Sequence, residues 1–164
     1  MFSQIIKNGS FSSTASWLRT TNAIIANGRL TVTVTGGGYE RAYQSVSYIP
    51  GRTYRLTAIV NGTATYQMRF RDAADDSGGL PANSGRVVLT GSPQRVEFEF
   101  TANANSNLMN IERDVVGDYS WTVDELVVSL KTPFNDIIKP ADVPTPIFND
   151  IIRTYAGEEP WQAK

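Results

Sequence analysis

Short segments in which apolar and polar residues alternate, separated by glycine and proline turns, are the feature that most constrains the fold of this chain. In one such segment Leu30, Val32 and Val34 alternate with arginine and threonine. A period of two residues is typical of a β-strand with one buried face. No window before Lys131 shows the 3.6-residue period of an amphipathic helix. Further strands are predicted at 63–72, 87–89, 96–101, 108–112 and 119–130.

The segment 41–60 (RAYQSVSYIPGRTYRLTAIV) is predicted to form a β-hairpin at the centre of the fold. Pro50-Gly51 supplies the turn, because proline presets φ and glycine accepts the positive φ that follows. Asn27-Gly28 is a second turn, of the kind that joins two strands through a two-residue loop. Short strands with such turns predict an all-β fold, an antiparallel β-sandwich of the jelly-roll type.

Composition excludes several classes of function. The 164 residues include no cysteine and no histidine, so thiolate metal sites and the commonest catalytic base are missing. The formal net charge is −1 and no basic run occurs, which argues against nucleic-acid binding. The start, MFSQIIKNGS, lacks the pattern of a signal peptide, and no segment has the length and hydrophobicity of a membrane span.

Carboxylates at two places are the candidates for catalysis. Asp72, Asp75 and Asp76 fall in one predicted loop, and Glu112 and Asp114 lie close together in the sequence. Glycoside hydrolysis needs two carboxylates across a sugar ring, one of them with a raised pKa. The sequence places no apolar pocket around either group and shows no serine nucleophile elbow. We therefore expect no enzymatic activity and no cofactor.

The character of the chain changes at Lys131. Residues 1–130 carry the strand pattern, whereas residues 131–164 hold five of the eight prolines and no alternation. We expect a sandwich domain over 1–130, followed by an extended Pro-rich C-terminal arm with short helical turns over 131–164.

This arm contains a duplicated motif. Phe-Asn-Asp-Ile-Ile followed by a basic residue occurs at 134–139 and again at 148–153. In each copy Phe, Ile and Ile fall on one face of a short helix, and a helix this short needs a surface on which to dock. The copies either pack on their own sandwich or bind equivalent grooves of an assembly, and we favour the second because symmetry repeats a groove. The predicted partner-binding residues are Phe134, Ile137, Ile138, Phe148, Ile151, Ile152 and Trp161.

Several short segments carry a resemblance to a known family: NGSF at 8–11, Trp17, NGRLTV at 27–32, YQ at 43–44, PGRTY at 50–54, FEFT at 98–101 and VDEL at 123–126. Together they resemble the jelly-roll carbohydrate-binding modules attached to xylanases and cellulases. Related domains also occur in bacteriophage virion proteins. The resemblance extends over residues 8–130 and implies the fold more firmly than any function, since this fold hosts many roles.

The resemblance implies a structural calcium ion near the first Asn-Gly turn, held in part by an acidic residue of the last strand, here Asp124. Where the family commonly has an acidic residue after that turn, this chain has Ser10. Calcium prefers several oxygen ligands, including carboxylates. Asp124 is therefore a weak calcium candidate, and we favour its interpretation as an ordinary strand carboxylate.

The resemblance also implies a sugar-binding surface made of exposed aromatic rings and polar side chains. Gln67 and Arg69 share one strand face, and Asn110 and Glu112 share another. Polar residues outside and aromatic residues inside occur in any sandwich, so we favour the purely structural interpretation of this pattern. The candidate glycan-binding residues are Tyr39, Tyr43, Gln67, Arg69, Asn110 and Glu112.

Two functions follow from these observations. We favour a non-catalytic virion structural protein, a phage capsid decoration or tail-associated protein made in the host cytoplasm without a signal peptide. Its arm is expected to bind virion subunits and further copies of this chain. The alternative is a carbohydrate-binding module for a polysaccharide or a cell-surface glycan, and a virion protein that also binds glycans combines the two.

Overall fold

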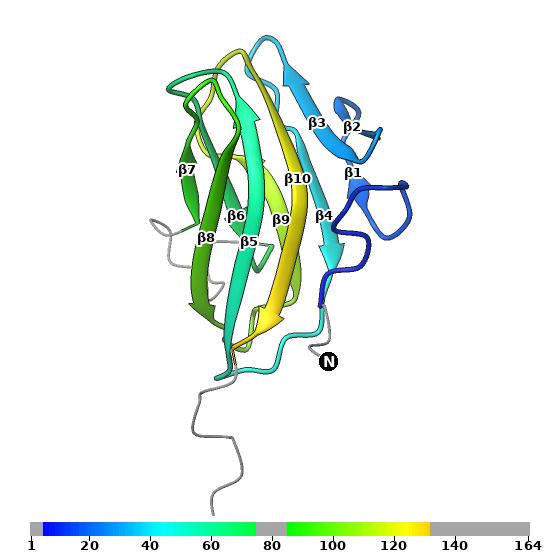
Figure 1. Ribbon diagram of the computed structural model, residues 1–164, viewed down its shortest axis with the longest axis vertical. Coiled ribbons are helices and arrows are strands. Elements are labelled where there is room, and N and C mark those ends of the chain that lie inside the picture. Colours follow the sequence, from blue (N-terminus) through cyan, green and yellow to red (C-terminus); the bar gives the residue numbers. More distant parts are fainter. Residues whose placement is uncertain (1–4, 75–84, 132–164) are drawn as a thin grey trace, which may run out of the picture. The chain divides into compact units, whose positions relative to one another are not determined.

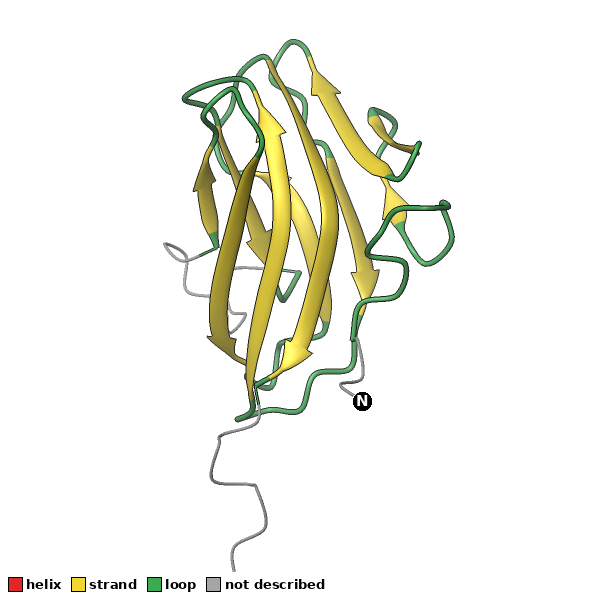
Figure 2. Cartoon of the chain, viewed as in Figure 1, coloured by secondary structure: helices red, strands yellow, loops and turns green. Residues whose placement is uncertain are grey.

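A computed structural model describes residues 5–74 and 85–131, which form two five-stranded sheets packed face to face (Figures 1 and 2). The strand pairs among these residues are all antiparallel, and these residues include no helix. Within the described ranges, accordingly, no helix could cross a membrane. The predicted antiparallel sandwich is confirmed.

Each sheet is named here after its central strand. The β9 sheet has the order β1 (Leu18–Arg19), β4 (Arg41–Ser45), β9 (Leu108–Arg113), β6 (Gln67–Arg71) and β7 (Arg86–Val88). The β10 sheet has the order β2 (Ala23–Ala26), β3 (Arg29–Val34), β10 (Tyr119–Leu130), β5 (Thr53–Gly62) and β8 (Gln94–Thr101). In Figure 1 the β10 sheet lies in front of the β9 sheet.

The core lies between the two sheets and is made by the inward side chains of both. Tyr66, Met68 and Phe70 are buried, as their alternation predicts, and Trp121 of β10 is completely buried. Fully burying one large apolar side chain stabilises the fold by about 1.5–3 kcal/mol. Because each strand gives one face to this core, its other face points outward and is free to carry polar side chains.

The turn at Asn27-Gly28 is confirmed. Asn27 and Gly28 have φ values of 54° and 73°, and they join β2 to β3 in the register that pairs Ala26 with Arg29. Two positive φ values in a two-residue loop are those of the turn that matches the natural twist of a hairpin.

The predicted hairpin over 41–60 is wrong. β4 pairs with β1 and β9, whereas β5 pairs with β10 and β8, so the chain passes from one sheet to the other between them. Gly51 does have a positive φ of 80°, but the connection also contains Val46 and Tyr48, whose side chains are buried. A connection that buries side chains in the core carries the chain across the sandwich instead of folding it back on itself.

The N-terminal segment is fastened to the last strand at an irregularity of β10. The pairing of β10 with β5 shifts register between Asp124 and Val127, and Glu125 has a φ of 51°. This bulge lets the amide of Leu126 donate to the carbonyl of Gly9 at 2.9 Å. An extra residue in one strand re-aims its neighbours in this way.

The predicted arm over 131–164 and its seven predicted partner-binding residues lie outside the described residues, apart from Lys131 itself. Asp75 and Asp76 of the predicted acidic loop also lie outside them. The boundary between sandwich and arm and the docking role of the arm therefore stay predictions.

Candidate functional site

The outer face of the β9 sheet gathers polar and charged side chains in rows that run across the strands. The register places Arg41 of β4 opposite Glu112 of β9, Glu112 opposite Arg69 of β6, and Arg69 opposite Arg86 of β7. Side chains opposite one another on antiparallel strands lie close enough to interact. The neighbouring row contains Tyr43, Asn110 and Arg71.

Glu112 is the centre of this face. Its side chain is completely buried, and the Nε atoms of Arg69 and Arg71 lie 2.6 Å and 2.7 Å from its Oε1 atom. Nη2 of Arg71 donates to Oε2 at 3.0 Å, and the hydroxyl of Tyr39 donates to the same oxygen. A buried carboxylate is tolerated only when it is paired and hydrogen-bonded in this way. Both oxygens of Glu112 are therefore occupied by this chain's own donors.

Asp114 extends the network toward the edge of the sheet. Its side chain is only 3% exposed, and Nε of Arg86 lies 2.8 Å from its Oδ2 atom. Nη1 of Arg69 lies 3.6 Å from Oδ1, so Arg69 joins the two buried carboxylates. The network formed by Tyr39, Glu112, Arg69, Asp114 and Arg86 spans β6, β7, β9 and the segment before β4.

Both predicted aromatic platforms are in contact with guanidinium groups. The guanidinium carbon of Arg41 lies 4.5 Å from the ring centroid of Tyr43, and that of Arg113 lies 5.2 Å from the ring of Tyr39. Arg41 also lies 5.8 Å from the Tyr39 ring. These distances are those of cation–π contacts.

Tyr39 keeps its hydroxyl proton. Burial and the hydrogen bond to the Glu112 carboxylate raise the pKa of Tyr39 above its ordinary value of 10.0. A neighbouring negative charge disfavours a second one, so the phenol stays neutral and acts as a donor to Glu112.

Asn110 carries an unpaired acceptor on this face. Its side-chain amide donates to the carbonyl of Ala73 at 2.6 Å, but its Oδ1 atom is buried and has no hydrogen-bond partner among the described residues. Buried polar atoms are nearly always paired, and an unpaired one costs about 1–3 kcal/mol.

The six candidate glycan-binding residues predicted from the sequence all belong to this one face. Tyr43, Gln67, Arg69, Asn110 and Glu112 point outward from β4, β6 and β9, as their register shows, and Tyr39 reaches the same face through its bond to Glu112. Glu112 and Asn110 are buried beneath the others, so they position neighbouring groups.

Sequence reasoning missed several members of the network. Arg41, Arg71 and Arg86 were not among the candidates, and Asp114 was considered only for catalysis. Their signal was the same two-residue alternation, since Arg71 lies two residues after Arg69 and Asp114 two residues after Glu112. Strand pairing between residues far apart in the chain was needed to bring them together.

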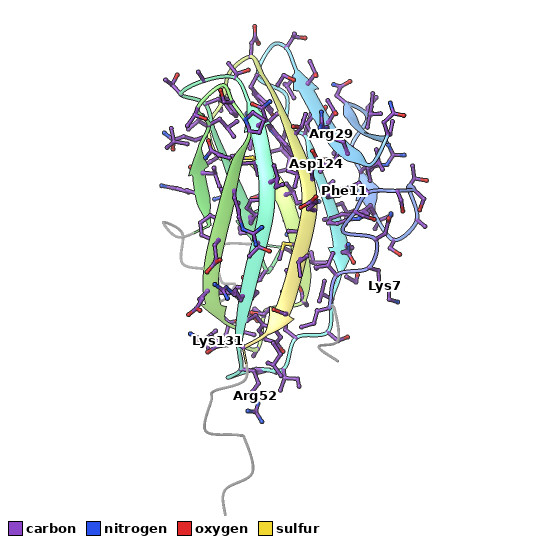
Figure 3. All side chains as sticks on the ribbon, viewed as in Figure 1. Lys7, Phe11, Arg29, Arg52, Asp124 and Lys131 are labelled. Carbon is purple, nitrogen blue, oxygen red and sulfur yellow. The ribbon has the colours of Figure 1, made fainter. Side chains whose placement is uncertain are left out.

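Asp124 does not lie in a calcium site. It faces outward from β10, and Nε of Arg29 on β3 lies 2.9 Å from its Oδ2 atom. Both residues are labelled in Figure 3. The nearby carbonyl of Gly9 already accepts from Leu126, and Oδ1 of Asn8 accepts from Ser12. No group of three acidic side chains that would suit a metal ion occurs in the described ranges. These residues do not fit a calcium ion.

A depression of about 340 Å³ lies beside the edge of the same sheet. It is lined by Lys7, Ser16, Trp17, Leu18, Gln44 and Ser45. Leu18 and Ser45 belong to β1 and β4, so the depression adjoins the outer face of the β9 sheet. Its volume is at the lower end of the range for small-ligand sites.

No protein-family model matches the sequence. No curated protein matches it either. Solved structures do match the fold. A family 4 carbohydrate-binding module (CBM4) has a TM-score of 0.57 at 15% identity, covering 72% of this chain and 96% of that chain. The N-terminal cellulose-binding domain of Cellulomonas fimi β-1,4-glucanase C has a TM-score of 0.55 at 17% identity, covering 76% of this chain and 95% of that chain.

The fold is the jelly roll of carbohydrate-binding modules, as the sequence resemblance predicted. Most of the similar structures are such modules. One comes from a virus: the enzymatically active domain of bacteriophage CBA120 tailspike protein 4, with a TM-score of 0.51 at 16% identity, covering 78% of this chain and 21% of that chain. At sequence identities this low, structural similarity shows a shared fold and does not by itself show a shared function.

Proposed function

We propose that this protein binds a glycan through the outer face of the β9 sheet. The observation that carries this proposal is the convergence of the six candidate residues, which come from three strands and a preceding segment, on one face. The fold shared with carbohydrate-binding modules supports it. This reverses the order of the two functions favoured from the sequence, because the similar structures are mostly carbohydrate-binding modules.

The network explains how such a face recognises sugar hydroxyls. Glu112 and Asp114 hold the guanidinium groups of Arg69, Arg71 and Arg86 in fixed orientations. Donors that are already oriented lose little conformational entropy when a ligand binds. In this proposal the exposed parts of Tyr39, Tyr43, Gln67, Arg69 and Arg86 contact the ligand, and Glu112 and Asp114 act as positioning residues.

We propose no catalytic role for this face. Glycoside hydrolysis requires a carboxylic acid that delivers a proton and a second carboxylate that reaches the sugar or a water molecule. Here both oxygens of Glu112 and at least one oxygen of Asp114 are engaged by arginine, and both side chains are buried. Neither carboxylate is placed for proton transfer to a ligand.

Binding of the full-length protein to a panel of neutral and charged polysaccharides tests the proposal. We expect affinity for at least one of them, weakened about tenfold or more by Gln67→Ala, since a lost polar contact leaves a ligand group unpaired. Thr57→Ala, on the outer face of the β10 sheet, is the matched control and should leave affinity unchanged. A protein that binds no glycan, or binds one equally well after Gln67→Ala and Tyr43→Ala, would rule the site out.

A second proposed function is that of a virion structural protein that displays this module. The likeness to part of a phage tailspike supports it, together with the duplicated Phe-Asn-Asp-Ile-Ile motif predicted to bind neighbouring subunits. If so, the protein copurifies with phage particles, and replacing Phe134 and Phe148 by alanine in the full chain releases it. Glycan binding by the same double variant should persist, because the two functions use separate parts of the chain.

A further inference from the structure

We infer that the ligand is an anionic polysaccharide, one whose sugars carry carboxylates, and that it lies across the strands of the β9 sheet. This inference rests on the proposed glycan-binding function. It begins with the balance of charge on the outer face, where four arginines accompany two carboxylates among the described residues. The whole chain has a net charge of −1, so this excess is local.

Two of these arginines keep donors that the protein does not use. Nε of Arg86 pairs with the carboxylate of Asp114. Within the described ranges, no ion pair or hydrogen bond involves the two terminal nitrogens of Arg86. The guanidinium of Arg41 has only its contacts with the rings of Tyr39 and Tyr43 in the part of the chain that the structure describes. The carboxylates of this face are already shared among Arg69, Arg71 and Arg86. The remaining donors are therefore available to an anion from outside.

Arginine is suited to that anion. A guanidinium presents a planar fork of donors that matches both oxygens of a carboxylate, and such charge-assisted pairs are stronger than hydrogen bonds between neutral groups. Neutral sugars depend instead on stacking over aromatic rings. On this face guanidinium groups already lie over the rings of Tyr39 and Tyr43, and no other aromatic side chain points outward from β4, β6 or β9.

The positions of Arg41 and Arg86 indicate a polymer rather than a single sugar. They stand at opposite ends of the row that runs from β4 through β9 and β6 to β7. Adjacent strands lie about 4.8 Å apart, so the two α-carbons are separated by about 14 Å. One sugar does not span this distance, whereas a chain with repeated carboxylates supplies an anion at each end.

The test is calorimetric titration of the full-length protein with three uronic acid polymers of different linkage: polygalacturonate, alginate and glucuronoxylan. Each is paired with its carboxyl-reduced form, which keeps the backbone and its hydroxyls but loses the charge. We expect at least one polymer to bind about tenfold or more tightly than its reduced form. Raising salt from about 0.05 M to about 0.5 M should weaken that binding, because it screens charges on an exposed face.

Three variants locate the binding. Arg41→Gln and Arg86→Gln should each weaken binding to the acidic polymer about tenfold, and each should weaken binding to the reduced form by a smaller factor. Arg41 makes no ion pair in the described residues, so its replacement tests the ligand without disturbing a buried carboxylate. Arg55→Gln, on the outer face of the β10 sheet, is the matched control, because Arg55 also pairs with a carboxylate. Its affinity should equal that of the wild type.

The outcomes separate the inference from the function on which it rests. Equal binding to an acidic polymer and its reduced form would overturn the inference and leave glycan binding intact. Binding to dextran sulfate but to no uronic acid polymer would mean that the face recognises sulfate groups instead of carboxylates, and it would overturn the inference. Failure to bind any polymer, neutral or charged, would overturn both.

Discussion

The two outer faces of this sandwich handle their charges in opposite ways. On the β10 sheet, Glu97 and Glu99 are 43% and 44% exposed, and each pairs with a single cation, Arg55 or Lys131. On the β9 sheet, Glu112 and Asp114 are 0% and 3% exposed. The same two-residue alternation therefore produces a solvated face on one side and a buried ionic network on the other.

The different burial of the carboxylates on the two faces indicates which face is the better candidate for a binding site. An exposed ion pair contributes between zero and about 1 kcal/mol, because water serves both partners almost as well. A buried carboxylate has no such alternative, so each of its partners is required. We propose ligand binding on the face that fixes its arginines through buried carboxylates, and the following predictions test the contrast between the two faces.

Glu112→Gln should have the largest effect. It removes the charge that Arg69 and Arg71 share and leaves two neighbouring guanidinium groups with less compensating charge. Breaking a buried ionic network by removing one partner costs about 3–5 kcal/mol, and urea denaturation measures the loss. Glu97→Gln on the opposite face is the control, and equal losses for the two variants would erase the contrast.

Tyr39→Phe should have an intermediate effect. It deletes one hydroxyl that donates to Glu112 and keeps the ring under Arg113. Removing one donor to a charged group costs about 1.5–3 kcal/mol, less than removing the charge itself. Thermal and urea unfolding should both show the loss, and a variant as stable as the wild type would mean that the arginines satisfy Glu112 alone.

Alkaline pH should reduce this contribution of Tyr39. Its pKa is raised above 10.0 in the folded protein, so the unfolded chain releases the phenolic proton first. The stabilisation is complete below the unfolded pKa and is lost as pH rises through the folded pKa. The difference in unfolding free energy between wild type and Tyr39→Phe should therefore shrink on going from neutral to strongly alkaline pH. A difference that grew with pH would reverse the sign of the pKa shift.

Arg55→Gln should have the smallest effect. Arg55 pairs with Glu97 on the solvated face, where both side chains are about half exposed. We expect the urea midpoint of the variant to match that of the wild type at low and at high salt, because such pairs are screened and weak. A loss comparable to that of Tyr39→Phe would show that the two faces are equivalent after all.

Local pattern was enough to predict most of the architecture. The strand 119–130 coincides with β10, and Asn27-Gly28 forms the predicted turn, because alternation and turn chemistry are properties of neighbouring residues. Which strand pairs with which depends on residues far apart in the chain, so it could not be predicted from local pattern. For that reason the pairing of 41–45 with 53–60 was wrong, although both segments are strands.

The candidate site was predicted in part for the same reason. Alternation identified Arg69 and Glu112 as outward residues of separate strands, and their 2.6 Å contact required strands 43 residues apart to become neighbours. The burial of each outward side chain was the other property that the sequence did not predict. Nothing local in the sequence distinguishes Glu112, which is buried, from Glu97, which is exposed, since both alternate with apolar residues.

The order in which strands enter the two sheets governs how the sandwich is assembled during synthesis. β9 joins β4 to β6, and β10 joins β3 to β5, so each sheet is held together by a strand near the end of the described chain. Until the ribosome has released both, the earlier strands exist only as separate pairs with exposed edges. Long-range pairing of this kind folds slowly and leaves apolar surface open to aggregation. The chain therefore commits to its fold only when β10, with Trp121 at the core, has left the ribosome.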